Sequence, residues 1–295
     1  MSATITATGT TFGVLARQEI RNYLRSKLFW FGAALTFALD VTMLLDLTND
    51  PTSSGSYMIA PAALLGVLGL VVMFGLTRRS DHAAEAAGAV AVPERTRTLA
   101  LASAIVVPLS VAILSFIAAV VTWYVHPPAG YVVPPGFSNA YVLAQMFGDG
   151  VLCAVGGPLL GLLLARYFPK RGITAVASVL LVIATILLQG GLFGGGQPYR
   201  VFWVWTYFLT QSSEGGPGQH HFTTVPGNPF LWLLYLVTLC ALGVVVAVRH
   251  DPESDRARLG KLAISLAVVA VVLGVLTMTV GFTESVVSPY VCPVC

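Results

Sequence analysis

Long apolar runs alternate with short charged stretches along the whole chain. Each run covers roughly 19 to 27 residues, and a helix of that length, rising about 1.5 Å per residue, can cross a hydrocarbon core of about 30 Å. The pattern therefore predicts an all-α fold, a polytopic membrane helical bundle with about seven transmembrane helices. The predicted spans are Leu28–Thr48, Met58–Thr77, Leu99–Val125, Tyr141–Ala165, Ile173–Phe193, Phe230–Val248 and Leu262–Phe282.

Basic residues lie almost entirely between these runs. Apart from Arg200, every Lys and Arg belongs to one of four stretches that follow an even number of crossings. Because basic loops are retained in the cytoplasm, this order predicts a cytoplasmic N-terminus and an extracytoplasmic tail over residues 283–295. The four stretches are Arg17–Lys27, Arg78–Arg97, Arg166–Arg171 and Arg249–Lys261.

The composition agrees with a membrane protein. Charged residues make up 10% of the chain and hydrophobic residues 56%, whereas soluble domains have about 25% charged residues. The net charge of +3 reflects the topology, and we expect no nucleic-acid binding. The first run is too long for the apolar core of a signal peptide, so we expect it to be retained in the mature protein. We expect the membrane to be a bacterial plasma membrane.

The region before the first span has a helical pattern. Apolar residues from Phe12 to Leu24 recur on one side, and Arg17, Arg21 and Arg25 lie on the other. This pattern favours an amphipathic helix in the membrane interface, after a loose tail over Ser2–Thr11. A solvated, positively charged flank is the alternative.

A second charged stretch follows the second span. Ala83–Ala87 favours a short helix, which Ser80 or Asp81 could cap and Gly88 could end. A charged helix projecting from a bundle suits the binding of another protein, although an ordinary solvated loop fits the same residues.

These two features resemble a known family. The segment Leu15–Trp30 looks like the elbow helix of type-2 ABC transporter permeases, and the stretch from Arg78 to Arg97 is similar to their coupling-helix loop. The resemblance implies an elbow containing Arg17, Glu19, Arg21 and Arg25. It also implies an ATPase-coupling loop containing Arg78, Arg79, Asp81, His82, Glu85, Arg95 and Arg97.

The family resemblance implies a transport subunit that is not itself an enzyme. It would pair with a second permease copy and with cytoplasmic ABC ATPase subunits, which bind ATP and Mg, while this chain holds no cofactor. The chain has no phosphate-binding loop, and the nearest approach, Gly260-Lys261, lacks the required flanking residues. The family commonly has six spans, so the run Leu262–Phe282 departs from its pattern. An amphiphilic drug-like compound, a lipid or a peptide would all suit as substrate.

Among the polar residues within predicted spans, two carboxylates and a nearby amide are candidates for a site. Asp40, Gln145 and Asp149 could line a cavity, because ionisable residues at membrane depth are costly to retain without a role. Alternatively, each carboxylate is hydrogen-bonded to a nearby hydroxyl, such as Thr36 or Thr42 beside Asp40.

Glycine and proline punctuate two of the spans. Gly156, Gly157 and Pro158 should kink the fourth span and are the best candidates for a hinge. Small residues also permit close helix contact without specifying a partner. These are Gly66 with Gly69 and Gly157 with Gly161.

The remaining features belong to the predicted outer side. Residues 201–209 are rich in Trp and Tyr and favour an interfacial or re-entrant helix. Cys292 and Cys295 could form a local disulfide or remain free thiols. The adjacent His220 and His221 give only a weak signal for a metal, and no metal site is predicted. A membrane-embedded enzyme, an accessory or scaffold subunit and a secondary transporter remain alternative functions.

Overall fold

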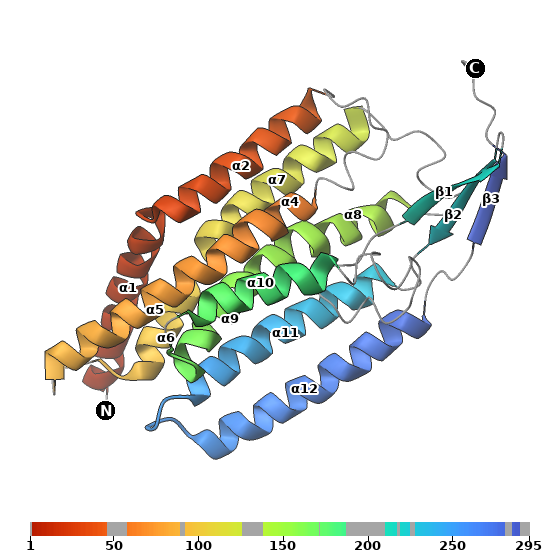
Figure 1. The fold of residues 1–295 in the computed structure, drawn as a ribbon. Helices are drawn as coiled ribbons and strands as arrows, with labels where there is room; N and C mark the ends of the chain where they lie inside the picture. Colours follow the sequence, from red (N-terminus) through yellow and green to blue (C-terminus); the bar gives the residue numbers. More distant parts are fainter. Residues whose placement is uncertain are drawn as a thin grey trace.

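The computed structural model is a bundle of long apolar helices with a small β-sheet beyond one end (Figure 1). It describes residues 2–45, 58–88, 92–125, 138–170, 172–186, 210–216, 219–224, 228–280 and 285–289, with only the backbone described for residues 2–10 and for the strands. Six helices in these ranges are long and apolar enough to cross a membrane, so the chain is a multi-pass helical membrane protein. They are Lys27–Leu44, Ile59–Ala87, Glu94–Val125, Asn139–Tyr167, Pro229–Arg249 and Arg256–Thr279.

These helices coincide with six of the seven predicted spans. The first is α2 (Lys27–Leu44), and the last two are α11 (Pro229–Arg249) and α12 (Arg256–Thr279). The remaining predicted span, Ile173–Phe193, corresponds to α10 (Ile173–Ile186). Its 14 described residues rise about 21 Å, less than the hydrocarbon thickness, and the rest of that predicted span lies outside the described residues.

Three of the long helices are built from consecutive segments. One comprises α4 (Ile59–Pro61), the π-helical turn η1 (Ala62–Gly66) and α5 (Val67–Ala87). Another comprises α6 (Glu94–Ser103) and α7 (Val106–Val125). The third comprises α8 (Asn139–Phe147), the π-helical turn η3 (Gly148–Leu152) and α9 (Cys153–Tyr167).

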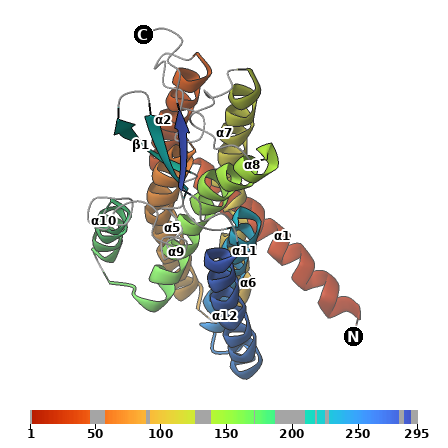
Figure 2. The ribbon, with the colours of Figure 1, turned by 90° about the vertical axis from the view of Figure 1, so that its right-hand side faces the viewer.

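The helix α1 (Ser2–Leu24) is separate from the first long helix. Ser26 has an extended backbone, with φ −72° and ψ 120°, and its hydroxyl accepts a hydrogen bond from the N–H of Phe29. This capping contact starts α2 in a new direction, and Figure 2 shows α1 leaving the bundle at an angle. The expected helix before the first span is therefore present, but it begins at Ser2, within the stretch that we expected to be a loose tail.

Two helices cross at unusually short range because of glycine. A Cβ atom added at Gly157 would collide with the backbone of Gly66, and one added at Gly161 would collide with the carbonyl oxygen of Leu70. The small residues of α9 therefore bring its backbone directly against η1 and α5. The sequence indicated close contact at these glycines, and the structure identifies the partner.

A three-stranded antiparallel sheet lies at the end of the bundle where α11 begins (Figure 1). Its strands are β1 (Thr210–Gly216), β2 (Gln219–Thr224) and β3 (Ser285–Pro289), with β2 in the centre. The all-α prediction missed it, since short polar strands give little period-two signal and β3 pairs with a segment more than 60 residues earlier.

Candidate functional site

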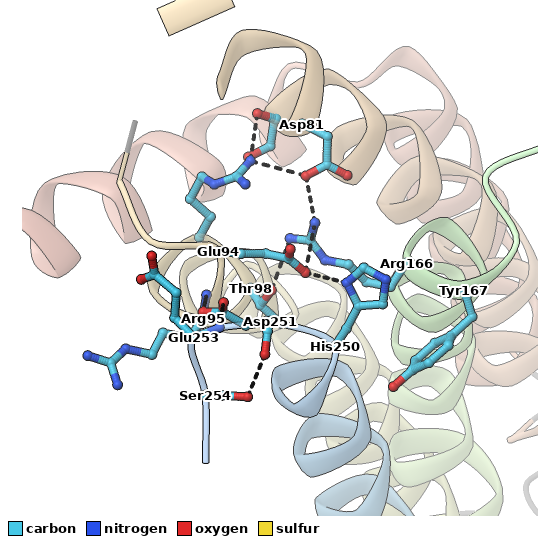
Figure 3. Close-up of polar contacts among 12 residues, drawn as sticks. Asp81, Glu94, Arg95, Thr98, Arg166, Tyr167, His250, Asp251, Glu253 and Ser254 are labelled. Atoms are coloured by element: carbon cyan, nitrogen blue, oxygen red, sulfur yellow. Dashed lines mark hydrogen bonds and ion pairs between the residues drawn. The ribbon is translucent and has the colours of Figure 1, made fainter. Parts of the chain in front are cut away.

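Charged side chains from four parts of the chain meet at one end of the bundle (Figure 3). At the centre is Arg166, in the last turn of α9, whose side chain is only 2% exposed. Its Nη1 lies 2.6 Å from Oδ1 of Asp81 in α5 and 3.6 Å from Oε1 of Glu94 in α6. Its Nη2 donates to Oγ1 of Thr98 at 2.9 Å. Arg166 thus joins three helices.

Two further side chains complete this ion-pair cluster, which comprises Asp81, Glu94, Arg97, Thr98, Arg166 and His250. Arg97 Nη1 donates to the carbonyl oxygen of Ser80 at 3.0 Å and to Oδ1 of Asp81 at 3.1 Å. His250, directly after α11, places Nδ1 2.6 Å from Oε1 of Glu94. The edge of Tyr167 packs against the imidazole ring, with centroids 5.2 Å apart.

The two arginines balance the two carboxylates. Removing a charged side chain from water costs free energy, which is offset only when the charge is paired and hydrogen-bonded. Deleting one partner of a buried ion pair costs about 3–5 kcal/mol. Helix polarity adds to the arrangement, because Glu94 lies in the first turn of α6 and Arg166 in the last turn of α9. The cluster therefore fixes the relative positions of α5, α6, α9 and the end of α11.

The start of α6 is capped from a distant segment. Pro93, at the cap position, makes no side-chain cap, and Oδ2 of Asp251 accepts a hydrogen bond from the N–H of Arg95 at 2.8 Å. Asp251 is 2% exposed and also accepts from the N–H of Glu253 at 2.9 Å. The connection between α11 and α12 is thus bound to α6 beside the ion-pair cluster.

Helix α1 contacts the same end of the bundle. Glu19 is buried, accepts a hydrogen bond from Asn22 at 3.1 Å and lies 3.7 Å from Nη2 of Arg79 in α5. One turn further on, Tyr23 is fully buried, and burial raises the pKa of its phenol. Its hydroxyl lies beside Gly69 and near Pro158, so α1 inserts a neutral aromatic side chain next to the α5–α9 crossing.

Beyond these contacts, the end of α5 projects from the bundle (Figure 1). His82 and Glu85, 3.4 Å apart, have side chains that are 63% and 77% exposed. The prediction of a separate short helix capped by Ser80 or Asp81 is wrong, because α5 continues without a break to Ala87. The predicted end at Gly88 is confirmed, since this residue has φ +60° and closes the helix. We call residues Asp81–Gly88 the α5 tip.

The structure brings together several residues that the family resemblance singled out. Arg79 meets Glu19, so the predicted elbow contacts the predicted coupling segment, and Asp81 meets Arg97. Arg95 contributes its backbone N–H rather than its charge. The basic residues singled out for the elbow are all exposed; Arg17 and Arg21 lie on α1, and Arg25 follows directly after it.

Sequence reasoning missed the partners of these residues. Arg166 and His250 were recognised only as members of basic stretches, and Glu94, Thr98 and Asp251 were not singled out. The one sequence feature that could have indicated these contacts is that all of the residues lie in charged stretches. Those stretches meet at one end of the bundle, which we call the basic end.

The polar residues within the long helices have different environments. Oδ2 of Asp40 accepts a hydrogen bond from the hydroxyl of Ser115 in α7 at 2.6 Å, so its partner is a hydroxyl but not one of the two near it in sequence. Gln145 is 3% exposed and its amide has no hydrogen-bond partner among the described residues. Asp149 lies in the π-helical turn η3. A cavity-lining role for the three stays a prediction.

The hinge prediction also remains open. Pro158 lies inside α9, and the described irregularity is the π-helical turn about two to three turns earlier, at Gly148–Leu152. Gly157 is held against Gly66.

The predictions for cysteines and metals have different outcomes. Cys292 and Cys295 lie outside the described residues. In the described ranges, no group of three or more His, Cys, Asp or Glu side chains could hold a metal ion.

The fold and the ion-pair cluster together define a multi-pass membrane protein in which several long helices are joined at one end by partly buried charges. Comparison of the chain with protein-family models, with curated proteins and with solved structures finds no match.

Proposed function

We propose that this chain is the permease subunit of an ATP-driven transporter of the type-2 ABC kind, acting as an exporter. ATP and Mg are bound by separate cytoplasmic ATPase subunits, and a second permease copy completes the translocation path. The cargo is an amphiphilic compound, a lipid or a peptide, moved by alternating access. The basic end faces the cytoplasm, as the retention of basic loops favours.

The observation that carries this proposal is the α5 tip. The side chains of His82 and Glu85 are exposed, yet the first residue of the tip, Asp81, is bound to the guanidinium groups of Arg97 and Arg166. A partner that pushes on the tip therefore moves a helix that is tied to α6 and α9. A loose loop at this position would absorb the displacement instead.

The same connections extend to two other elements. Glu94 joins His250 at the end of α11, and Arg79 joins Glu19 of α1. Displacement of α5 would consequently reach four other helices: α1, α6 and α9 through contacts of α5 itself, and the end of α11 through Glu94 of α6. We propose that ATPase subunits dock on the tip and on the exposed side of α1, and that the ion-pair cluster distributes the motion.

The test uses surface residues, because changes to Asp81 would disturb the cluster. The full chain is co-expressed with candidate ABC ATPases, chosen from genes that neighbour its own, and co-purification is measured for the wild type and for the double variant His82→Ala/Glu85→Lys. We expect ATPase recovery to fall about tenfold, which corresponds to a loss of about 1.4 kcal/mol of binding free energy.

The matched control is Glu253→Lys, which makes the same charge change at an exposed position of the basic end. It should leave ATPase recovery unchanged. Equal recovery for wild type and the double variant would contradict docking at the α5 tip.

A further inference from the structure

Helix α10 is the most loosely packed of the described helices that lie within predicted spans. Leu181 is its one buried residue, and Figure 2 shows the helix at the margin of the bundle, beside α5 and α9. Apolar cavities lie on both sides of Leu181. One, of about 300 Å³, lies toward α9 and α11, and the other, of about 210 Å³, lies toward η1 and α5.

The larger cavity is apolar throughout. Its walls come from leucine and glycine residues of α9 and α11, together with the thiols of Cys153 and Cys240. In the smaller cavity, the hydroxyl of Thr185 is bonded to the carbonyl oxygen of Leu181 in its own helix. Buried water needs two to four polar partners, and apolar cavities of about 150 Å³ remain dry and take up apolar molecules. These walls therefore favour an apolar occupant over water.

The dimensions and depth of the larger cavity fit one acyl chain. The lining runs from Leu152 at the end of η3 to Leu163 in α9, which is about 16 Å along the helix axis. That length is close to half of a hydrocarbon core of about 30 Å. The cavity thus extends from the middle of the bundle toward the basic end, over the thickness of one leaflet.

A cation lies in the connection between two helices that line the cavity. The helices α9 and α10, which both line the cavity, are joined at the basic end by a short connection that contains the exposed Lys170. A lysine at the membrane surface attracts anionic lipid headgroups by about 1 kcal/mol. Charge and apolar lining together select a lipid over a hydrophobic peptide.

From these observations we infer that the space between α9, α10 and α11 is a binding site for one acyl chain of an anionic phospholipid, with its headgroup near Lys170. The acyl chain fills the cavity beside Leu181 and so connects α10 to α9 and α11. This site does not depend on the proposed transport function.

The test is photo-crosslinking in a bilayer. The full chain is reconstituted in nanodiscs with phosphatidylglycerol that carries a diazirine in the middle of one acyl chain, and adducts are located by mass spectrometry. We expect adducts concentrated on the peptides that contain Leu181 and Leu239 of the cavity wall.

A cavity-filling variant provides the decisive comparison. A Cβ atom at Gly243 would lie 3.8 Å from Leu163 and 4.0 Å from Leu159, so Gly243→Leu fits and extends into the cavity. We expect it to reduce these adducts about fivefold, since overpacking disfavours a second occupant. The control, Gly75→Leu, places the same side chain at an exposed position with open space and should change nothing. Leu239→Trp is a second filling variant if Gly243→Leu does not fold.

Two further measurements complete the test. Phosphatidylglycerol should give about fivefold more adduct than the matching phosphatidylcholine, and Lys170→Gln should abolish that preference. Equal yields from the two lipids, or no effect of either filling variant, would overturn the proposal. Labelling of Cys240 by a charged, membrane-impermeant thiol reagent would also overturn it, because the cavity would then contain water.

Discussion

The carboxylate of Asp251 accepts a hydrogen bond from the backbone N–H of Arg95 at 2.8 Å, although the two residues are 156 positions apart. The contact supplies the start of α6 with the cap that Pro93 cannot provide. The connection between α11 and α12 and the first turn of α6 therefore form one structural unit beside the ion-pair cluster.

Removing this cap should weaken the bundle. For Asp251→Ala we expect a loss of about 0.5–2 kcal/mol in the free energy of unfolding, the usual cost of removing a capping side chain. Thermal unfolding of the purified protein in mild detergent measures the change. The adjacent, exposed Glu253→Ala is the control, and equal midpoints for the two variants would rule out the capping role.

Loss of the central guanidinium should cost more. Arg166→Met removes a buried guanidinium and leaves the partly buried carboxylates of Asp81 and Glu94 short of a cation, so we expect the free energy of unfolding to fall by up to about 3–5 kcal/mol. Arg166→Lys should recover only part of it, because an ammonium cannot contact Asp81 and Thr98 with two fixed nitrogens. The exposed Arg258→Met should leave unfolding unchanged, and an equally mild effect of Arg166→Met would show that the cluster contributes no net stability.

The close crossing of α5 and α9 makes the effect of alanine depend on position. Gly161→Ala forces its Cβ atom onto the carbonyl oxygen of Leu70, and we expect the free energy of unfolding to fall by about 1–3 kcal/mol. At Gly75 a Cβ atom meets nothing within 4 Å, so Gly75→Ala should stabilise the helix by up to about 1 kcal/mol. Opposite signs in thermal unfolding would support the crossing, and stabilisation by both variants would contradict it.

Orientation can be tested with single cysteines in a background without the native ones. His82→Cys lies at the exposed α5 tip, and Ser138→Cys lies at an exposed position of the opposite end, just before α8. An impermeant thiol reagent should label the Ser138 variant in intact cells and the His82 variant only after permeabilisation. The reverse result would place the basic end outside and would end the proposal of a cytoplasmic ATPase partner.

Sequence reasoning was most accurate for the long helices. Six predicted spans match helices of the structure, because an apolar run of sufficient length leaves a chain few alternatives in a bilayer. It failed for the start of the α5 tip, where Ser80 and Asp81 resemble capping residues. The preference of Ser and Asp for the start of a helix is overridden here by tertiary contacts. Arg97 binds both the Ser80 carbonyl and the Asp81 carboxylate, and α5 continues through both residues.

The sequence by itself determined which segments are apolar, how long they are and where the basic stretches fall between them, because these properties follow from side-chain transfer and helical rise alone. The tertiary structure decided which charges meet. Asp81 and Arg166 are 85 positions apart, and Glu94 and His250 are 156 apart. The contact of Asp81 with Arg166 accompanies the close approach of α9 to η1 and α5 at Gly157 and Gly161, and a hydrophobicity pattern records no partner for these helices.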